Sequence, residues 1–349
     1  MGKNFTFLKN IYRSNTWELN SIAKLIFCVT FKCNLKCKIC SIWKKDHREE
    51  LSVGEIEKMF KKLPNLSWLD LTGGEIALRE DLIDVIRTII THSRNLKGFH
   101  MTSNGMLPEK IIKAAQEVIR LKLKPVISIS IDGPPEVHDL LRGHKGSYAQ
   151  AIKTFTALKS LKNSDTHISC TISKFNLKYI DEFVAALKKD VPRFSMKDLH
   201  FNFYHVSGHY YANETLGEKG KEGIGFSHIR KYFRMRGGQN FIKNYLEDKY
   251  LFYLEKYLNG EKISLACQAL HGSVFVDAYG TVFPCLYYNR PIGRLNEIDY
   301  DINKLLKSPD LDQLKIQVKH QDCDRCWSDC EAYPMIIGNL LKLTKPASN

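Results

Sequence analysis

The sequence lacks any long uninterrupted run of apolar residues. No stretch approaches the ~18 residues that a membrane-spanning helix needs. Residues 1–20 also lack the basic head, apolar middle and small-residue cleavage site of a secretory signal. No internal repeat or low-complexity tract is present. These absences predict a cytoplasmic protein without a transmembrane segment.

Cysteine, by contrast, is plentiful, with ten residues in a chain of 349. Cytoplasmic thiols are kept reduced, so metal or cluster ligation explains them better than disulfide bonds, which are the alternative. Three of them, Cys33, Cys37 and Cys40, form a tight C-x3-C-x2-C run, and five more lie in the last quarter of the chain. Cys28 and Cys170 fall inside predicted strands and are expected to be core residues.

The charge balance is basic, with 52 Lys and Arg against 38 Asp and Glu and a formal net charge of +14. The lysines are spread over nearly every amphipathic segment, and no RNA-binding aromatic run appears. We therefore expect a solvated lysine-rich surface and no specific nucleic-acid partner. The charge is compatible with an anionic substrate or with an acidic electron-donor protein.

Apolar runs alternate with amphipathic segments over the first two thirds of the chain. Strands are predicted at residues 25–30, 68–72, 97–102, 126–131, 167–172 and 199–203. Helices are predicted after a capping box at Ser52 and Glu55, and at residues 82–92, 108–121, 148–161 and 177–187. This alternation requires a parallel sheet, either an open doubly wound sheet or a barrel. Six units rather than eight would make a partial (β/α)6 barrel with an open side.

The pattern divides the chain into four parts. Residues 1–21 form an N-terminal lead, and residues 22–215 form the α/β barrel. Residues 216–262 are a connector with a glycine-rich stretch at 217–225 and helical patterning at 226–259. Residues 263–349 form a small C-terminal α+β domain that carries the late cysteines.

The first three cysteines allow three interpretations. Zinc would want a fourth ligand, and the nearest histidine, His47, lies seven residues beyond Cys40. A fully ligated electron-transfer cluster needs a fourth thiolate from elsewhere, whereas a cluster with one open iron needs only Cys33, Cys37 and Cys40. Polar and glycine-rich segments follow the strands at 73–75, 103–105 and 132–134, so functional groups are expected at the carboxyl ends of the strands.

In this context the cysteine run, followed by Gly73, Gly74 and Glu75 after the second strand, resembles the radical S-adenosylmethionine (SAM) superfamily. The resemblance spans about residues 22 to 210. It implies that the three thiolates hold a [4Fe–4S] cluster whose open iron binds SAM. It also implies reductive cleavage of SAM to a 5′-deoxyadenosyl radical that abstracts hydrogen from a substrate, with the cofactor supplying the difficult chemistry.

The resemblance also assigns roles to other residues. Gly73, Gly74 and Glu75 are expected to contact the methionine ammonium of SAM, with a plain glycine turn as the alternative. Ser130 is expected at the SAM ribose and Arg142 at the SAM carboxylate, with a buried strand serine and a surface salt bridge as alternatives. Weaker candidates for SAM contact are Ser173 and Asn176. Two departures from the family pattern, Ile39 and Ile76, do not affect ligands.

The late cysteines resemble the SPASM and Twitch extensions of radical SAM enzymes, which bind auxiliary clusters. Cys267 and Cys285 flank a predicted hairpin of residues 274–276 and 281–283, and a C-x2-C-x3-C motif follows at Cys323, Cys326 and Cys330. Five thiols can complete one [4Fe–4S] cluster, which makes a Twitch-like domain the better match. The preferred ligands are the first four, although Cys330 could replace Cys323 or Cys326. A zinc site is the alternative.

These features predict a radical SAM enzyme that abstracts hydrogen and then oxidises or cross-links its substrate with help from the auxiliary cluster. The substrate class is open between a small molecule, a lipid and a peptide; only 32 residues precede Cys33, which disfavours the N-terminal peptide-recognition domain that many peptide-modifying relatives carry. A flavodoxin or ferredoxin is the expected electron donor. The alternative from another class is a non-catalytic iron–sulfur or zinc protein. No catalytic base is identified, although Asp132, His200, Tyr204 and His205 lie near strand ends.

Overall fold

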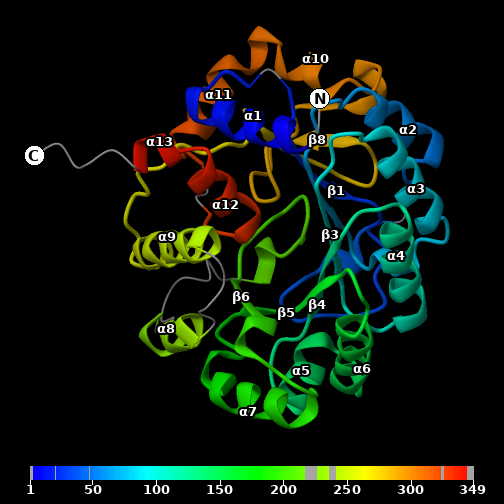
Figure 1. Cartoon of the computed structure of the whole chain (residues 1–349), viewed down its shortest axis with the longest axis vertical. Coiled ribbons are helices and arrows are strands. Elements are labelled where there is room, and N and C mark those ends of the chain that lie inside the picture. The colour runs from blue at the N-terminus through cyan, green and yellow to red at the C-terminus, as the bar shows by residue number, and fades with distance from the viewer. Residues whose placement is uncertain are drawn as a thin grey trace, which may run out of the picture.

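The computed structural model describes residues 3–19, 21–46, 48–216, 226–235, 241–323 and 326–343. His47 and the glycine-rich stretch at 217–225 lie outside these residues. The chain folds around one twisted sheet with helices along its outer side (Figure 1). Among the described helices, none is long and apolar enough to cross a membrane.

Six parallel strands form the main part of the sheet, in the order β6-β5-β4-β3-β2-β1. They are β1 (Lys24–Cys28), β2 (Trp68–Thr72), β3 (Gly98–Ser103), β4 (Pro125–Ser130), β5 (Asp165–Ile172) and β6 (Leu199–Phe203). All six predicted strands are confirmed, with ends that differ by at most two residues. The architecture is the predicted partial barrel, because the strands follow one another in spatial order rather than reversing at a switch point.

The crossover helices cover the outer side of the sheet as an arc in Figure 1. They are α2 (Val53–Lys61), α3 (Leu82–His92), α4 (Pro108–Arg120), α5 (Pro135–Arg142), α6 (Ser147–Lys159) and α7 (Ile180–Asp190). The predicted capping box is confirmed, because Ser52 accepts from the Glu55 amide at 3.3 Å and Glu55 accepts from the Ser52 amide at 3.0 Å. The apolar faces of the crossover helices pack on the buried strands to form the core.

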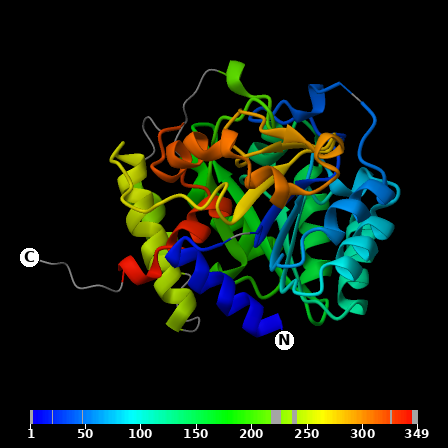
Figure 2. The ribbon, with the colours of Figure 1, turned by 90° about the horizontal axis from the view of Figure 1, so that it is seen from above.

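The C-terminal part adds three strands to the other side of β1. These are β7 (Ser273–Val276), β8 (Thr281–Phe283) and β9 (Gly293–Arg294). The predicted hairpin of β7 and β8 is confirmed as an antiparallel pair. The sequence pattern did not indicate that β7 also pairs in parallel with β1, so that the hairpin extends the barrel sheet (Figure 2).

The remaining helices pack on the sides of this sheet. The predicted N-terminal lead contains α1 (Lys3–Thr16), and the helical connector contains α8 (Phe226–Met235) and α9 (Phe241–Leu258). The C-terminal part contributes α10 (Ile302–Leu306), α11 (Asp312–Lys319), α12 (Asp329–Ile337) and α13 (Leu340–Leu343). Helix α12 packs against both α9 and α1, which ties the two ends of the described chain together (Figure 1).

Candidate functional site

A cavity of about 820 Å³ occupies the inside of the barrel. Its lining includes inward-facing residues of the six parallel strands and the loop that follows β1. Residues of the C-terminal part complete the wall, among them Tyr287 and Cys330. Large pockets of this kind, with a few polar groups on a mostly apolar wall, are the usual place for ligands.

The three early thiols meet at this cavity. Cys33, Cys37 and Cys40 all lie in the loop after β1 and line the wall. Burial raises the pKa of Cys33 to about 11 and that of Cys40 to about 12, and neighbouring thiolates add to both shifts. In the described part of the chain, no three Cys, His, Asp or Glu side chains close around a single ion-sized point. Three thiols on one loop at the wall of a cavity fit a [4Fe–4S] cluster that leaves one iron without a protein ligand.

Two glycines hold this loop in place. A Cβ on Gly74 would lie 2.4 Å from the carbonyl oxygen of Lys32, and one on Gly73 would lie 2.6 Å from that of Thr30. The Gly74 amide donates to the Thr30 carbonyl at 2.8 Å. Only glycine allows the two loops to approach this closely, and both glycines line the cavity.

Glu75 turns away from the cavity that Gly73 and Gly74 line. Its carboxylate is buried and accepts from the amides of Ala77 at 3.0 Å and Asn104 at 2.7 Å, and from the hydroxyl of Ser103 at 2.9 Å. Burial raises its pKa, and these hydrogen bonds oppose the shift. Glu75 therefore ties the loop after β2 to the loop after β3.

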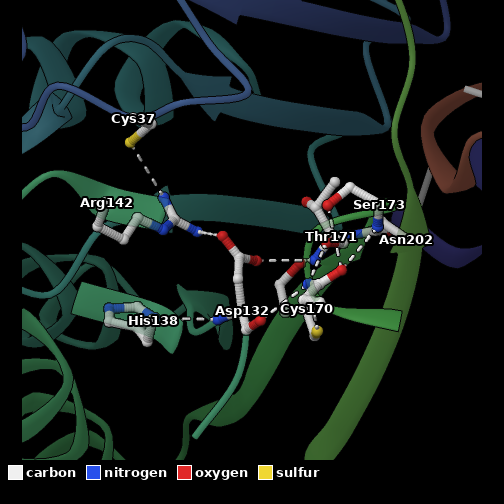
Figure 3. Close-up of polar contacts among 10 residues, drawn as sticks. Cys37, Asp132, His138, Arg142, Cys170, Thr171, Ser173 and Asn202 are labelled. Carbon is white, nitrogen blue, oxygen red and sulfur yellow. Dashed lines mark hydrogen bonds and ion pairs between the residues drawn. The ribbon is translucent and has the colours of Figure 1, made fainter. Parts of the chain in front are cut away.

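Arg142 stands between the thiol loop and a buried carboxylate (Figure 3). It is the last residue of α5, which Gly143 ends in a left-handed conformation. One guanidinium nitrogen, Nη2, lies 2.7 Å from Asp132 Oδ2, and Nη1 lies 3.9 Å from Cys37 Sγ. Although burial opposes it, the negative charges of Asp132 and the thiolates raise the pKa of Arg142, so the guanidinium stays charged.

Asp132 is itself held rigidly. Its other carboxylate oxygen accepts from the Thr171 amide at 2.9 Å, and its own amide donates to Nδ1 of His138 at 3.0 Å (Figure 3). The side chain of Asn176 donates to the Asp132 carbonyl at 2.8 Å and accepts from the Ser173 amide at 2.8 Å. Of the predicted SAM contacts, Ser130 at the end of β4 lines the cavity, whereas Ser173 and Asn176 support the loop that holds Asp132.

The late cysteines separate between two places. A second, small pocket is lined by four of them, Cys267, Cys285, Cys323 and Cys326, together with Glu331. Cys330 lines the large cavity instead. Residues 324–325, between two of these cysteines, lie outside the described residues.

The thiols of the second pocket are buried close to a carboxylate, Glu331. Burial raises the pKa of Cys267, Cys285 and Cys326, and the charge of Glu331 adds to each shift. Glu331 is buried, its pKa is raised to about 7, and among the described residues neither of its carboxylate oxygens has a hydrogen-bond partner. Four thiols around one cavity fit a fully ligated cluster.

Two tyrosines connect the thiol groups. Tyr211 and Tyr287 both line the large cavity, and their rings are 6.4 Å apart. The Tyr211 carbonyl lies 3.8 Å from Cys40 Sγ, and the Tyr287 amide donates to Cys285 Sγ at 3.5 Å. Tyr287 therefore lies between the large cavity and the thiols of the second pocket.

A row of polar side chains that we did not predict crosses the inner face of four neighbouring strands. This polar belt consists of Asp70, His100, Ser128 and His167, one from each of β2 to β5. His100 Nδ1 lies 3.1 Å from Asp70 Oδ1, and His100 Nε2 lies 2.7 Å from Ser128 Oγ. Ser128 Oγ lies 2.6 Å from His167 Nε2. The available signal was a polar residue in each strand, but β3, β4 and β5 also contain other polar residues.

The belt continues at both ends. Lys24 on β1 forms an ion pair of 2.9 Å with Asp70, and its ammonium also donates to the carbonyl of Cys330. His200 on β6 lies against His167, with ring centroids 4.3 Å apart. Of the other predicted base candidates, Tyr204 lines the cavity, whereas His205 has its ring nitrogens at the Phe203 carbonyl and the Trp327 amide.

Comparison with protein families gives two matches. The radical SAM superfamily model matches residues 27–189, and the model of SPASM, an iron–sulfur cluster-binding domain, matches residues 267–331. The first match implies a [4Fe–4S] cluster and SAM, and the second implies auxiliary iron–sulfur ligation. The two matched segments contain all eight of the cysteines that line the two cavities.

Curated relatives are similar over part of their length. The chain is 30% identical to the mycofactocin maturase MftC of Mycolicibacterium smegmatis over 178 residues, which are 49% of this chain and 40% of that protein. It is 32% identical to the subtilosin biosynthesis protein AlbA of Bacillus subtilis over 139 residues, which are 38% of this chain and 29% of that protein. The alignments thus cover less than half of either relative.

Solved structures share the fold. The structure of Streptococcus suis SuiB bound to its precursor peptide SuiA has a TM-score of 0.59 at 15% identity, covering 97% of this chain and 77% of that one. That of anSMEcpe with bound AdoMet has a TM-score of 0.57 at 18% identity, covering 88% and 81%. The family matches therefore show that the chain carries a radical SAM domain, whose thiol loop lies on the barrel cavity, and a SPASM-type iron–sulfur domain.

Proposed function

We propose that this chain is a radical SAM enzyme that modifies a peptide. The observation that carries the proposal is the meeting of Cys33, Cys37 and Cys40 with Gly74 and Arg142 on one wall of the large cavity. When bound there, a [4Fe–4S] cluster and SAM supply a carbon-centred radical that removes hydrogen from an unreactive carbon. The walls of the cavity would hold the substrate beside that radical and keep water out.

The residues present fit these groups. Cys33, Cys37 and Cys40 would hold the first cluster and leave one iron for SAM. Gly73 and Gly74 allow a backbone approach to the SAM ammonium, and Ser130 lies at a strand end where it could meet the ribose. Arg142 has an Nε donor without a partner among the described residues, so it could also bind the SAM carboxylate.

The second pocket would hold the auxiliary cluster. We assign Cys267, Cys285, Cys323 and Cys326 as its ligands, because these four line the pocket and Cys330 faces the large cavity. We keep residues 22–215, 216–262 and 263–349 as barrel, connector and auxiliary domain, with the qualification that β7 continues the barrel sheet. A cluster with four protein ligands is suited to accepting an electron from the substrate.

The peptide substrate is proposed by likeness. MftC and AlbA are named for the maturation or biosynthesis of peptide products, and SuiB was solved with a precursor peptide. A small molecule or a lipid would be the other substrate classes for a cavity of this size. We place the enzyme in the cytoplasm, where a flavodoxin or ferredoxin would deliver electrons to the basic surface.

The test is anaerobic reconstitution followed by incubation with SAM and dithionite. The wild type should form 5′-deoxyadenosine and contain about eight irons per chain, four for each cluster. The Cys37→Ala variant should form none and contain about half the iron. Absence of 5′-deoxyadenosine from the wild type, or an undiminished amount from Cys37→Ala, would contradict the proposal and favour a non-catalytic iron–sulfur or zinc protein.

The substrate requires a second experiment. Peptides encoded next to the gene would be co-expressed with the wild type and with Cys37→Ala, and their masses compared. A mass change that depends on Cys37 would identify the peptide. If no peptide changes mass while 5′-deoxyadenosine still forms, the substrate class is wrong and the radical chemistry stands.

A further inference from the structure

The polar belt occupies a layer that barrels usually fill with branched apolar side chains. Here the layer is polar and the space above it is open, because all four belt residues line the same cavity as Cys33, Cys37 and Arg142. An apolar layer would pack more stably than a buried row of partly charged groups. The belt therefore faces the ligand that occupies the cavity. Its residues lie inside the strands, whereas the predicted SAM contacts lie at the strand ends or beyond them.

At one end of the belt, the negative charge of Asp70 is paired with the positive charge of Lys24. Although burial alone would raise it, the Lys24 ammonium and the hydrogen bond from His100 hold the pKa of Asp70 well below its usual range. Asp70 is 6% exposed, and its Oδ1 also accepts from the indole nitrogen of Trp68 at 2.8 Å. Asp70 is therefore an ionised carboxylate that only accepts hydrogen bonds.

This fixes the direction of each hydrogen bond along the belt. Because Asp70 accepts, Nδ1 of His100 carries a proton, and in the tautomer that carries only this proton Nε2 is an acceptor. The hydroxyl of Ser128 must then donate to His100, and its lone pairs accept from Nε2 of His167. In this arrangement every proton of the belt points toward Asp70, and the tautomer of His167 with its proton on Nε2 has its lone pair on Nδ1.

A carboxylate, an imidazole and a hydroxyl in this order form the geometry that orients an imidazole as a general base. A proton arriving at His167 can move to Ser128 as the serine proton moves to His100. The resulting imidazolium is stabilised by Asp70 at 3.1 Å. Two of the other candidates are committed elsewhere, because Asp132 is paired with Arg142 and both ring nitrogens of His205 face backbone groups.

We propose that the polar belt is the general-base relay that accepts a proton from the substrate. The inference rests on the proposed function and specifies its substrate chemistry: the attacked carbon lies next to an N–H or O–H group. With SAM and both clusters bound, the substrate would lose a hydrogen atom to the SAM-derived radical, a proton to His167 and an electron to the auxiliary iron–sulfur cluster. Two electrons and two protons leave in total, and a new double bond or ring bond forms in the substrate.

The experiment separates hydrogen abstraction from proton removal. The peptide identified by co-expression is deuterated at the modified carbon and incubated with reconstituted holoenzyme, SAM and dithionite. Deuterium in 5′-deoxyadenosine reports abstraction, and the mass of the peptide reports the oxidised product. If the proposed function is wrong, the wild type itself will not transfer deuterium. If only the relay is wrong, the wild type will transfer deuterium and the belt variants will form as much oxidised product as the wild type.

Two serines on the same inner face provide a matched pair. Ser128 belongs to the belt, whereas Ser169 lines the same cavity on β5 and accepts a hydrogen bond from Asn202 at 2.6 Å. Ser128→Ala should retain deuterium transfer but lose at least tenfold in oxidised product per 5′-deoxyadenosine, since acid–base groups contribute about 10²–10⁴-fold. Ser169→Ala also removes a serine hydroxyl from the cavity wall and should keep the wild-type ratio of oxidised product to 5′-deoxyadenosine.

Two more readouts protect the test against misfolding. Iron content and 5′-deoxyadenosine formation show whether each variant is assembled. The second variant, His167→Gln, removes the imidazole that would accept the proton and leaves Ser128 unmutated. A low product ratio in both Ser128→Ala and His167→Gln, with normal iron content, supports the relay. A wild-type ratio in either assembled variant, or an equal loss in Ser169→Ala, overturns it.

Discussion

Replacement of Arg142 should lower the reduction potential of the cluster held by Cys33, Cys37 and Cys40. The guanidinium is charged, the Arg142 side chain is 13% exposed, and Nη1 lies 3.9 Å from Cys37 Sγ. A positive charge at this place stabilises the reduced cluster, which carries one more negative charge than the oxidised one. Arg142→Gln keeps a polar side chain there but removes the charge.

The magnitude follows from Coulomb's law. Two unit charges 3.9 Å apart interact by about 4 kcal/mol at an effective dielectric constant of about 20. The added electron spreads over the whole cluster rather than residing on Cys37, so we take about a third of this energy. About 1.4 kcal/mol is a tenfold change in the reduction equilibrium, or about 59 mV for a one-electron couple.

Asp132 distinguishes a positioning role from a simple charge effect. If only net charge mattered, Asp132→Asn would remove a negative charge near the cluster and raise the potential. If Asp132 instead holds the guanidinium against Cys37, as the 2.7 Å ion pair indicates, Asp132→Asn releases Arg142 and lowers the potential. We expect the lowering, and an intermediate value for Arg142→Lys because lysine lacks the planar fork.

The assay is a potentiometric titration of the reconstituted protein monitored by electron paramagnetic resonance. The signal that changes on addition of SAM identifies the relevant cluster. The control is Lys38→Gln, which removes an exposed charge next to Cys37 that solvent already screens. An unchanged potential in Arg142→Gln would refute the electrostatic reasoning, and a raised potential in Asp132→Asn would refute the positioning role.

Three further predictions concern the supports of the site. Gly74→Ala should lose the first cluster and about half of the iron, because its Cβ would meet the Lys32 carbonyl at 2.4 Å, whereas Gly54→Ala in α2 meets nothing within 4 Å and should load normally. Burial lowers the pKa of His138 from 6.5 to about 3, so its contribution to stability is present above pH 6.5 and is lost as the pH falls. Urea titrations should show a loss of about 2 kcal/mol between about pH 6.5 and pH 5 that is missing from His138→Gln. Ser52→Ala should lower the unfolding free energy by about 1 kcal/mol in the same assay, with no change in iron content.

The sequence predicted those parts of the fold that depend on local pattern. Alternating strands and amphipathic helices located the six barrel units, since each unit buries its own apolar face. The helix cap at Ser52 was predictable because its hydrogen bonds join residues three apart. The cysteine spacing and the glycines after β2 pointed to one end of the barrel, and the structure brings Cys33, Cys37, Cys40, Gly73 and Gly74 to one wall.

Long-range pairings were not predictable from such patterns. Nothing local in residues 273–276 indicates that they pair with β1, because a short apolar strand can join either edge of a sheet. The direction of the Glu75 side chain away from the cavity was also not evident, since its partners Ser103 and Asn104 lie at the end of β3 and in the loop after it. The polar belt shows the same difficulty, because His100, Ser128 and His167 belong to three different strands and only the pairing of these strands brings their side chains within hydrogen-bond distance.

The parallel pairing of β7 with β1 also affects how the protein matures. Lys24 pairs with Ser273, so the first strand made by the ribosome waits for one of the last before both its edges are covered. Contacts so distant in sequence form slowly, and an uncovered apolar strand invites association with other chains in the meantime. Both thiol pockets depend on this late event, because Cys33 follows β1 and Cys285 follows β8. Iron–sulfur assembly should therefore act on a nearly complete chain, and the supply of clusters would then trap the finished fold.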